Sequence, residues 1–365
     1  MGIACGIVGL PNVGKSTLFN ALTSNQAEAA NYPFCTIDPN VGIVNVPDKR
    51  LKRLVQGYQT DREVPTTMEF VDIAGLVKGA SKGEGLGNQF LGNIRACDAI
   101  AHVVRCFADD DVIHVHGAVN PLSDIEIIET ELILKDTETV DKKMESLQKR
   151  IRANDKEAAA DTEVLTALAA HLNSGKPARS FVRDERGSQV VRECFLLTDK
   201  PVMYIANTDE RGVKDGNAMI SAVRHKAIEE GAVVVPICAK IEAEIAQLDP
   251  EDREMFLVDL GMEEPGLHRV IREGYALLGL ITFLTAGKKE CRAWTVKKNS
   301  FAPQAAAAIH TDFEKGFIRA EVMKYADWER LGGSEQAVKD AGLYRIEGKE
   351  YVVQDGDIMY FRFNV

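Results

Sequence analysis

Residues 9–17 read Gly9-Leu10-Pro11-Asn12-Val13-Gly14-Lys15-Ser16-Thr17 and directly follow an apolar run from Ile3 to Val8. The stretch matches the pattern G-x-x-x-x-G-K-[ST], and its place after a strand-like run makes the match informative. Glycines in such a loop let backbone N–H groups face phosphate oxygens at the start of a helix. The sequence therefore predicts a nucleoside triphosphate site in an α/β domain.

Individual side chains of this loop have expected roles. Lys15 spans the β- and γ-phosphate oxygens, and the hydroxyl group of Ser16 is placed to bind Mg²⁺. The predicted phosphate-binding residues are Asn12, Val13, Gly14, Lys15, Ser16, Thr17 and, further along the chain, Gly75.

A second acidic element follows in the order that a P-loop site requires. Asp72-Ile73-Ala74-Gly75 comes at the end of a predicted strand. We therefore expect Asp72 to hold Mg²⁺ through a water molecule and the Gly75 N–H group to face the γ-phosphate. Thr36 precedes the strand expected from Val41, and its hydroxyl group can reach Mg²⁺ when the γ-phosphate is present. The predicted metal-binding residues are thus Ser16, Thr36 and Asp72.

The residue after this motif bears on hydrolysis. Ras-like switches carry a glutamine there, which orients the attacking water, whereas this chain has Leu76, which cannot hydrogen-bond water. Hydrolysis is therefore expected to be slow or to be assisted by other groups. The candidates are Asn12, whose side chain can help to hold K⁺ against the phosphates, and His114, as a catalytic acid or base. Together with Lys15 they form the predicted catalytic set.

The expected base pocket departs from the guanine pattern N-K-x-D. This chain has Asn207-Thr208-Asp209-Glu210, and Glu210 carries one methylene more than the aspartate that accepts hydrogen bonds from guanine. Thr208 lacks the long lysine stem that covers the base. Disrupting a site built for polar contacts to guanine should release much of its preference. Cys238-Ala239-Lys240 matches the S-A-K base loop, so the predicted base-binding residues are Asn207, Thr208, Glu210, Cys238 and Ala239.

Alternating apolar and amphipathic segments predict a P-loop NTPase of the α/β class, with a Rossmann-like, mostly parallel sheet. The expected strands of this sheet are Ile3–Val8, Val41–Val46, Thr67–Asp72, Ala99–Cys106, Pro201–Ala206 and Ala232–Ile237. The P-loop domain is expected to occupy residues 1–120 and 201–277.

Residues 121–200 interrupt this domain with helical spacing. A capping box at Ser123–Glu126 opens a long helix, and a second helix follows a joint near Ala153–Asp155, which predicts an antiparallel coiled-coil arm. A protruding arm that meets a partner and a helical pair that packs only on its own domain both remain open. Residues 278–365 form a small α+β module with a helix near Ala302–Phe313. Its expected strands are Leu280–Leu284, Cys291–Val296, Tyr351–Val353 and Ile358–Phe363.

The net charge of −11 for 365 residues gives no sign of nucleic-acid binding by the whole surface. From Gly279 to Val365, eight Lys and five Arg oppose twelve Asp and Glu, so this end is the relatively basic one. Four lysines, Lys288, Lys289, Lys297 and Lys298, are expected to cluster beside Trp294. The seven cysteines include no C-x-x-C pair, and no secretion signal or membrane span is expected. These features predict a cytosolic protein.

The phosphate loop, the segment Gly75–Asn88 and the Asn207–Glu210 variant resemble the Obg-like ATPase family, in its YchF group, over essentially the whole chain. This resemblance implies a helical insertion and a C-terminal β-grasp (TGS) domain. It also implies ATP preference over GTP, because of N-x-x-E, and K⁺-responsive hydrolysis, because of the leucine after D-x-x-G. Its implied partners are the ribosome, specifically the large subunit, and RNA. We expect a Mg²⁺-dependent ATPase that acts as a nucleotide-controlled switch, in a monomer without membrane contact.

Two alternatives remain open at this point. A guanine-specific translational GTPase would share the fold and would differ in whether Glu210 permits guanine to bind. A nucleotide-sensing scaffold, whose turnover is incidental, is favoured by Leu76.

Overall fold

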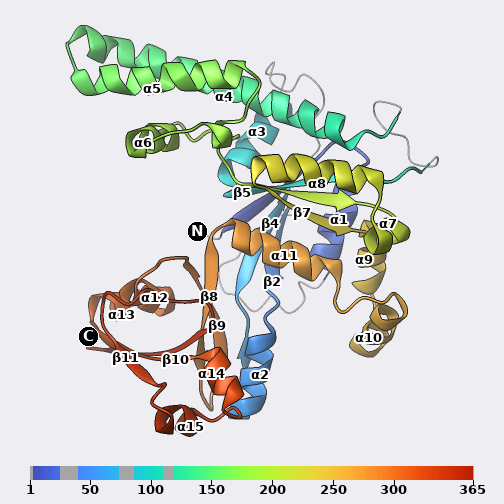
Figure 1. Ribbon diagram of the computed structural model, residues 1–365, viewed down its shortest axis with the longest axis vertical. Coiled ribbons are helices and arrows are strands. Elements are labelled where there is room, and N and C mark those ends of the chain that lie inside the picture. The colour runs from blue at the N-terminus through green and yellow to red at the C-terminus, as the bar shows by residue number, and fades with distance from the viewer. Residues whose placement is uncertain (1–2, 25–39, 74–85, 110–117, 365) are drawn as a thin grey trace. The chain divides into compact units, whose positions relative to one another are not determined.

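A computed structural model describes residues 3–24, 40–73, 86–109 and 118–364 of the chain (Figure 1). The chain divides into two compact units, and both are discontinuous in sequence. The first unit combines Met1–Val44 with Glu69–Gly274, and the second combines Asn45–Met68 with Tyr275–Val365.

The first unit contains a six-stranded sheet with the order β2-β4-β1-β5-β6-β7. β1 is parallel to β4 and β5, and the parallel pairing continues from β5 to β6 and from β6 to β7. The central strands β1, β5 and β6 are buried along their whole length, as expected for strands covered on both faces. The strands are β1 (Ala4–Val8), β2 (Val41–Asn45), β4 (Thr67–Asp72), β5 (Ala99–Arg105), β6 (Val202–Asn207) and β7 (Val233–Ile237). All six lie where the sequence predicts them, so the α/β fold class is confirmed.

Helices cover this sheet. α4 packs on α8 and α1 packs on α9, and the two pairs lie on opposite sides of the sheet (Figure 1). The helices of the first unit outside the arm are α1 (Lys15–Thr23), α3 (Leu86–Ala96), α7 (Glu210–Asp215), α8 (Ala218–Glu230), α9 (Ala239–Ile245), α10 (Pro250–Asp259) and α11 (Gly266–Leu277), whose last three residues belong to the second unit. None of the described helices is long and apolar enough to cross a membrane.

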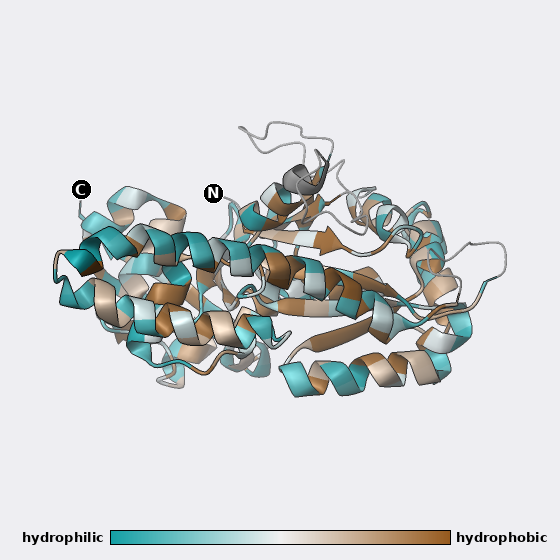
Figure 2. Ribbon diagram, turned by 90° about the horizontal axis from the view of Figure 1, so that it is seen from above, coloured by the Kyte–Doolittle hydropathy of each residue, from teal (hydrophilic) through white to brown (hydrophobic). Residues whose placement is uncertain are grey.

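The expected helical hairpin is present. α4 (Pro121–Arg152) and α5 (Lys156–Asn173) pack along each other and are joined by residues 153–155, where the Asp155 side chain accepts hydrogen bonds from the first N–H groups of α5. The hairpin encloses its own apolar cluster with the short η3 (Ala178–Ser180) and α6 (Glu185–Glu193). Its far end is hydrophilic (Figure 2).

The start of this arm differs from the prediction. The predicted capping box at Ser123 is wrong, because the cap of α4 is Asn120, three residues earlier, and the helix begins at Pro121. The Asn120 side chain accepts a hydrogen bond from the Ser123 N–H group at 3.3 Å. Proline is favoured in the first helical turn because its missing N–H would have no partner there, which explains the earlier start.

The second unit has a mixed sheet with the order β11-β10-β12-β8-β9-β3. One face packs on α12, and the other packs on α2, α14 and α15. Its strands are β3 (Glu63–Val64), β8 (Leu280–Ala286), β9 (Cys291–Lys297), β10 (Phe317–Lys324), β11 (Arg345–Glu347) and β12 (Asp357–Phe363). Its helices are α2 (Lys49–Tyr58), α12 (Ala302–Ile309), α13 (Thr311–Lys315), α14 (Tyr325–Arg330) and α15 (Glu335–Asp340).

The expected boundary of the C-terminal module at residue 278 leaves out a part of this unit. Residues 45–68 contribute β3, which pairs with β9, and α2, whose Leu51 and Leu54 are buried in the same cluster as Trp328. Arg50 of α2 also forms an ion pair with Asp355 at 2.6 Å. The segment between β2 and β4 therefore completes the C-terminal sheet and belongs to the second unit.

Two further expectations for this unit are corrected. No strand forms at Tyr351–Val353, where Val352 makes a single bridge with Phe301, and β10 takes the place beside β12. The expected lysine cluster is divided, because Lys288 and Lys289 precede β9 whereas Lys297 and Lys298 lie at its far end. At about 3.4 Å per residue, β9 alone separates the two pairs by roughly 20 Å.

Candidate nucleotide site

The predicted phosphate loop joins β1 to α1. Gly14 precedes the first residue of α1 with φ 96°, a conformation that favours glycine, and a Cβ atom there would collide with the Asn207 side-chain amide. Asn12 also adopts a positive φ of 60°. The loop therefore ends at a helix N-terminus, where the first backbone N–H groups have no partner within the helix, and such an end is suited to binding anions.

Lys15 is the charged group of this loop. Its side chain is only 8% exposed, and its Nζ atom donates a hydrogen bond to the Leu10 carbonyl oxygen at 2.7 Å. Burial lowers the pKa of Lys15, an effect that the nearby Asp72 carboxylate opposes. Burial likewise raises the pKa of Asp72, and the positive charge of Lys15 opposes that shift. The ammonium group and the carboxylate thus lie close enough to influence each other beside the phosphate loop.

The donors in this region fit a divalent cation. Asp72 ends β4, and its Oδ1 atom is buried without a hydrogen-bond partner among the described residues. Ser16, in the first turn of α1, is exposed and lines the adjacent cavity. A hydroxyl oxygen and a carboxylate oxygen are ligands that Mg²⁺ prefers, directly or through water.

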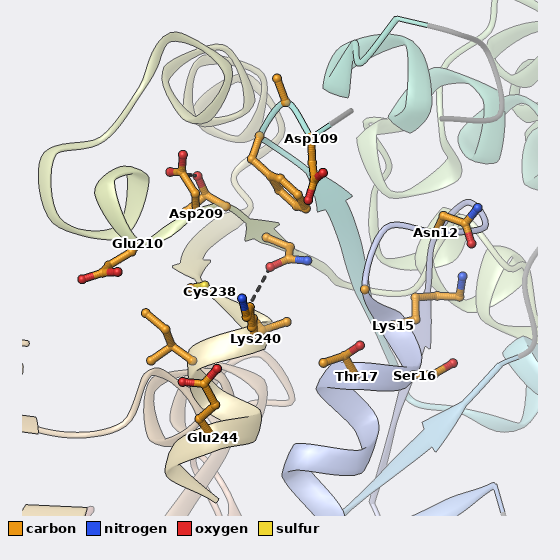
Figure 3. A pocket seen from close by; sticks show the side chains of 17 residues that line it. Asn12, Lys15, Ser16, Thr17, Asp109, Asp209, Glu210, Cys238, Lys240 and Glu244 are labelled. Atoms are coloured by element: carbon orange, nitrogen blue, oxygen red, sulfur yellow. Dashed lines mark hydrogen bonds between the residues drawn. The ribbon is translucent and has the colours of Figure 1, made fainter. Parts of the chain in front are cut away.

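A cavity of about 740 Å³ extends from the phosphate loop toward the ends of β5, β6 and β7. Asn12, Lys15, Ser16 and Thr17 lie on one side of it, and Glu210, Cys238, Lys240 and Glu244 lie on the other (Figure 3). This volume falls in the range of small-molecule sites, and the cavity lies at the carboxyl ends of parallel strands, where ligands bind in open α/β sheets.

Asn207 joins the two sides of this cavity. Its buried amide donates a hydrogen bond to the Val13 carbonyl oxygen at 2.9 Å and accepts one from the Ala239 N–H group at 3.0 Å. A single side chain therefore links the phosphate loop to the loop that begins α9. Asn207 was predicted as a base-binding residue, and in the described structure its side chain bridges two loops.

The other three residues of the segment Asn207–Glu210 differ in what they contact. The hydroxyl group of Thr208 is buried, donates to the Cys106 carbonyl oxygen at 3.2 Å and accepts a hydrogen bond from the Asn217 amide at 3.1 Å. Asp209 caps α7 by accepting a hydrogen bond from the Gly212 N–H group at 2.7 Å. Glu210 is exposed at the first position of α7 and lines the cavity.

The predicted S-A-K-like loop also borders the cavity. Cys238, Ala239 and Lys240 all line it, and Cys238 immediately precedes α9. Burial raises the pKa of the Cys238 thiol, so this group stays protonated at neutral pH. The loop therefore offers backbone groups, a neutral thiol and the Lys240 side chain to a ligand.

Several lining residues were not predicted. Phe107, Ala108 and Asp109 follow β5 and form a further wall of the cavity, and Ile241 and Glu244 contribute from α9. The position of residues 107–109 directly after a predicted buried strand is the signal that was available, because polar and binding residues gather at the carboxyl ends of parallel strands. The lining residues contributed by other segments are at least 90 residues away in sequence.

Some predicted site residues lie outside the described residues. These are Thr36 and Gly75, predicted at Mg²⁺ and the γ-phosphate, together with Leu76 and His114, which bear on hydrolysis.

Comparisons with known proteins found matches in both units. A family profile described as a 50S ribosome-binding GTPase matches residues 4–157, and the profile YchF-GTPase_C, described as a protein of unknown function, matches residues 280–364. The Ribosome-binding ATPase YchF of Haemophilus influenzae is 58% identical over 365 residues, and that of Bacillus subtilis is 54% identical over 367 residues. In both cases 100% of each chain is covered.

A solved structure shares the fold over nearly the same length. The YchF GTPase of Schizosaccharomyces pombe superimposes with a TM-score of 0.88 and 38% sequence identity, covering 99% of this chain and 98% of that one. Full-length relatives above half identity and a matching fold lead to one conclusion. This chain belongs to the YchF family.

Proposed function

We propose that this chain is a Mg²⁺-dependent ATPase that hydrolyses ATP to ADP and phosphate, and whose nucleotide state controls its binding to the ribosome. The observation that carries the proposal is the cavity of about 740 Å³, with a P-loop at one end and the Asn207–Glu210 segment at the other. Family membership and the name of the relatives, Ribosome-binding ATPase, support the nucleotide and the partner.

The phosphate end would work by charge neutralisation and positioning. Lys15 and the backbone N–H groups at the start of α1 would contact the phosphates. These contacts would hold the terminal phosphoryl group in position for attack by water. When bound, Mg²⁺ supplies further neutralisation at the phosphate oxygens, held by Ser16, by Thr36 and through water by Asp72. Asn12 would hold K⁺ beside the phosphates, and His114 is proposed as an acid or base.

The preference for adenine follows from the base end. A guanine site needs a short carboxylate at the fourth position of N-K-x-D, and Glu210 stands there with a longer side chain. Asp209 does not replace it, because its carboxylate caps α7 through the Gly212 N–H group. A pocket without the paired carboxylate contact loses the main source of guanine selectivity.

Calorimetric titration tests this preference directly. The purified protein is titrated with non-hydrolysable analogues of ATP and of GTP in buffer that contains Mg²⁺ and K⁺. ATP is expected to bind at least about tenfold more tightly, which corresponds to about 1.4 kcal/mol. Omitting Mg²⁺ should weaken the binding of both analogues. A preference of the same size for GTP would contradict the proposal.

A GTPase is the second candidate, and specific observations favour it. The profile over residues 4–157 is described as a GTPase, and so is the related structure from Schizosaccharomyces pombe. The same titration distinguishes the two candidates. An ATPase should bind the ATP analogue with the lower dissociation constant, and a GTPase should bind the GTP analogue with the lower one.

Ribosome binding is proposed to use the basic residues of the second unit against RNA phosphates, and such a partner places the protein in the cytosol. Because Lys288 and Lys289 lie at the opposite end of β9 from Lys297 and Lys298, the two pairs can be reversed to glutamate separately and together. The affinity of a protein for RNA phosphates falls strongly when its lysine side chains at the contact are removed or reversed. The four-residue variant should cosediment with ribosomes far less than the wild-type protein.

A matched control has the same change in net charge at another place. Reversal of four exposed cations of the arm, Lys142, Lys149, Arg152 and Lys156, alters the total charge by the same amount. Equal losses in both variants would mean that only bulk charge matters. Unchanged cosedimentation of the β9 variant would eliminate these lysines as a contact and leave the arm as the candidate.

A further inference from the structure

We propose that Arg105 is a positioning residue of the nucleotide site, which holds the wall formed by residues 107–109 and thereby sets the affinity for the nucleoside part of the ligand. This inference rests on the proposed function only in that the cavity must bind a purine nucleoside triphosphate. It adds a residue that the sequence motifs did not indicate and that does not itself line the cavity.

The first observation is the burial of a permanent charge. Arg105 is the last residue of β5, and its side chain is only 1% exposed. A buried guanidinium group is costly unless its donors are satisfied, and an apolar side chain at this strand position would avoid the cost. The position therefore calls for a group that donates several hydrogen bonds in fixed directions.

The second observation is what these donors contact. The Nε atom donates to the carbonyl oxygen of Phe107 at 3.1 Å, and an Nη atom donates to the carbonyl oxygen of Asp109 at 3.0 Å. The guanidinium carbon also lies 4.7 Å from the centre of the Phe107 ring. One rigid, planar side chain thus fixes both the backbone of the turn and the aromatic ring that it carries.

The third observation is that the same segment is tied to the base loop from its other side. The Cys106 N–H group donates to the Asn207 carbonyl oxygen, and the Cys106 carbonyl oxygen accepts hydrogen bonds from Thr208 and from the Asn217 amide at 2.8 Å. Residues 107–109 are therefore held between Arg105 and the loop after β6. Asp109 lies above the cavity, across from the phosphate loop helix (Figure 3).

These contacts predict an effect on one part of the ligand only. Phe107, Ala108 and Asp109 follow β5, whereas Lys15 and Ser16 begin α1. Loosening residues 107–109 should therefore weaken contacts to the nucleoside and leave the phosphate contacts intact. Inorganic tripolyphosphate, which lacks the nucleoside, serves as the probe for the phosphate end alone.

The experiment compares Arg105→Met and Arg105→Lys with the wild-type protein in the presence of Mg²⁺. Arg105→Met should weaken the binding of the non-hydrolysable ATP analogue at least tenfold, with tripolyphosphate affinity within twofold of the wild type. The KM for ATP should rise by a similar factor and kcat should stay within about threefold. Arg105→Lys keeps the charge but cannot donate to both carbonyl groups in the same fork geometry. Its affinity for the ATP analogue should therefore lie between those of the wild type and Arg105→Met.

Arg179→Met is the matched control, because Arg179 is a mostly buried arginine of the same unit that pairs with Glu230 at 3.1 Å and does not line the cavity. This variant should lose thermal stability without a change in either affinity. If Arg105→Met fails to fold, Phe107→Leu alone and combined with Arg105→Lys gives the same information. Once the Phe107 ring is absent, Arg105→Lys should reduce the affinity for the ATP analogue by a smaller factor than it does in the wild-type background.

Other outcomes would overturn the inference. Unchanged affinity for the nucleotide in Arg105→Met, or an equal loss of nucleotide and tripolyphosphate binding, would show that Arg105 supports the fold and does not position this wall. A wild-type preference for GTP would instead contradict the proposed ATPase, and the ratio of nucleoside triphosphate to tripolyphosphate affinity would still test Arg105 with GTP as the ligand.

Discussion

The phosphate end of the cavity is made by one continuous segment, whereas the base end is assembled from three segments far apart in the chain. Residues 9–17 bring backbone N–H groups, Lys15 and Ser16 together through local geometry alone. The base end needs residues 107–109, 207–210 and 238–241, which are held by the buried side chains of Arg105, Asn207 and Thr208. The backbone of one loop specifies the first end, and long-range hydrogen bonds specify the second.

The largest effect is expected at the phosphate end. Lys15→Ala removes the charge that would face the β- and γ-phosphates, so kcat/KM for ATP hydrolysis should fall about 100-fold or more, measured by phosphate release. Lys240→Ala, which removes an ammonium group from the base end of the same cavity, should change it less than about tenfold. Hydrolysis by Lys15→Ala within a factor of ten of the wild type would place the phosphates elsewhere. Full ribosome cosedimentation of an inactive Lys15→Ala protein would support the scaffold alternative.

The bridge between the two ends comes next. Asn207→Ala leaves the buried Val13 carbonyl and Ala239 N–H groups without their partners, at about 1–3 kcal/mol each. We expect a loss of about 2–4 kcal/mol in the free energy of unfolding, measured by urea denaturation, together with weaker binding of the ATP analogue. Asn207→Asp keeps the acceptor for Ala239 but places a buried carboxylate oxygen against the Val13 carbonyl oxygen. Its loss in the free energy of unfolding should therefore be at least as large as that of Asn207→Ala. No measurable loss in either variant would mean that the two loops are held independently.

A smaller and more specific change is expected at residue 210. Glu210→Asp shortens the carboxylate to the length that guanine sites use, and should strengthen GTP binding about tenfold, or about 1.4 kcal/mol, in the calorimetric titration. Glu244→Asp shortens another carboxylate that lines the same cavity and should leave GTP affinity unchanged. Equal effects of both substitutions would show that residue 210 does not decide the choice of base.

The last effect is as small as the change at residue 210 and concerns the strand beneath the base end. Burial lowers the pKa of His102 from its ordinary value of 6.5 to about 3. Because the folded state keeps this ring neutral, its contribution to stability is complete above pH 6.5 and is lost as the pH falls toward 3. Between pH 7.5 and 5.5 the wild-type protein should lose about 1.4 kcal/mol from this group.

Urea denaturation at the two pH values checks this prediction. His102→Gln should remove that part of the pH dependence, whereas His225→Gln, at an exposed position of α8, should retain it. An unchanged slope in His102→Gln would contradict a buried neutral histidine.

Much of the fold was predictable because its signals are local. The six strands of the first sheet were placed from short apolar runs, and the helical hairpin from its spacing and its joint at residues 153–155. The cap of α4 was misplaced by three residues, because Asn120 and Ser123 are both good caps and the proline between them decides which one begins the helix. Local rules thus fix which elements form and leave their ends less certain.

Local sequence is enough to predict the phosphate loop, the parallel sheet and the hairpin, since each depends on residues within one turn, one strand or one helical repeat. The three-dimensional packing was needed to establish that residues 45–68 complete the C-terminal sheet and that the four lysines form two separate pairs. The packing also brings Arg105 to the backbone of Phe107 and lets Asn207 bridge two loops. These features depend on hydrogen bonds and buried contacts between distant segments, whose partners no local pattern specifies.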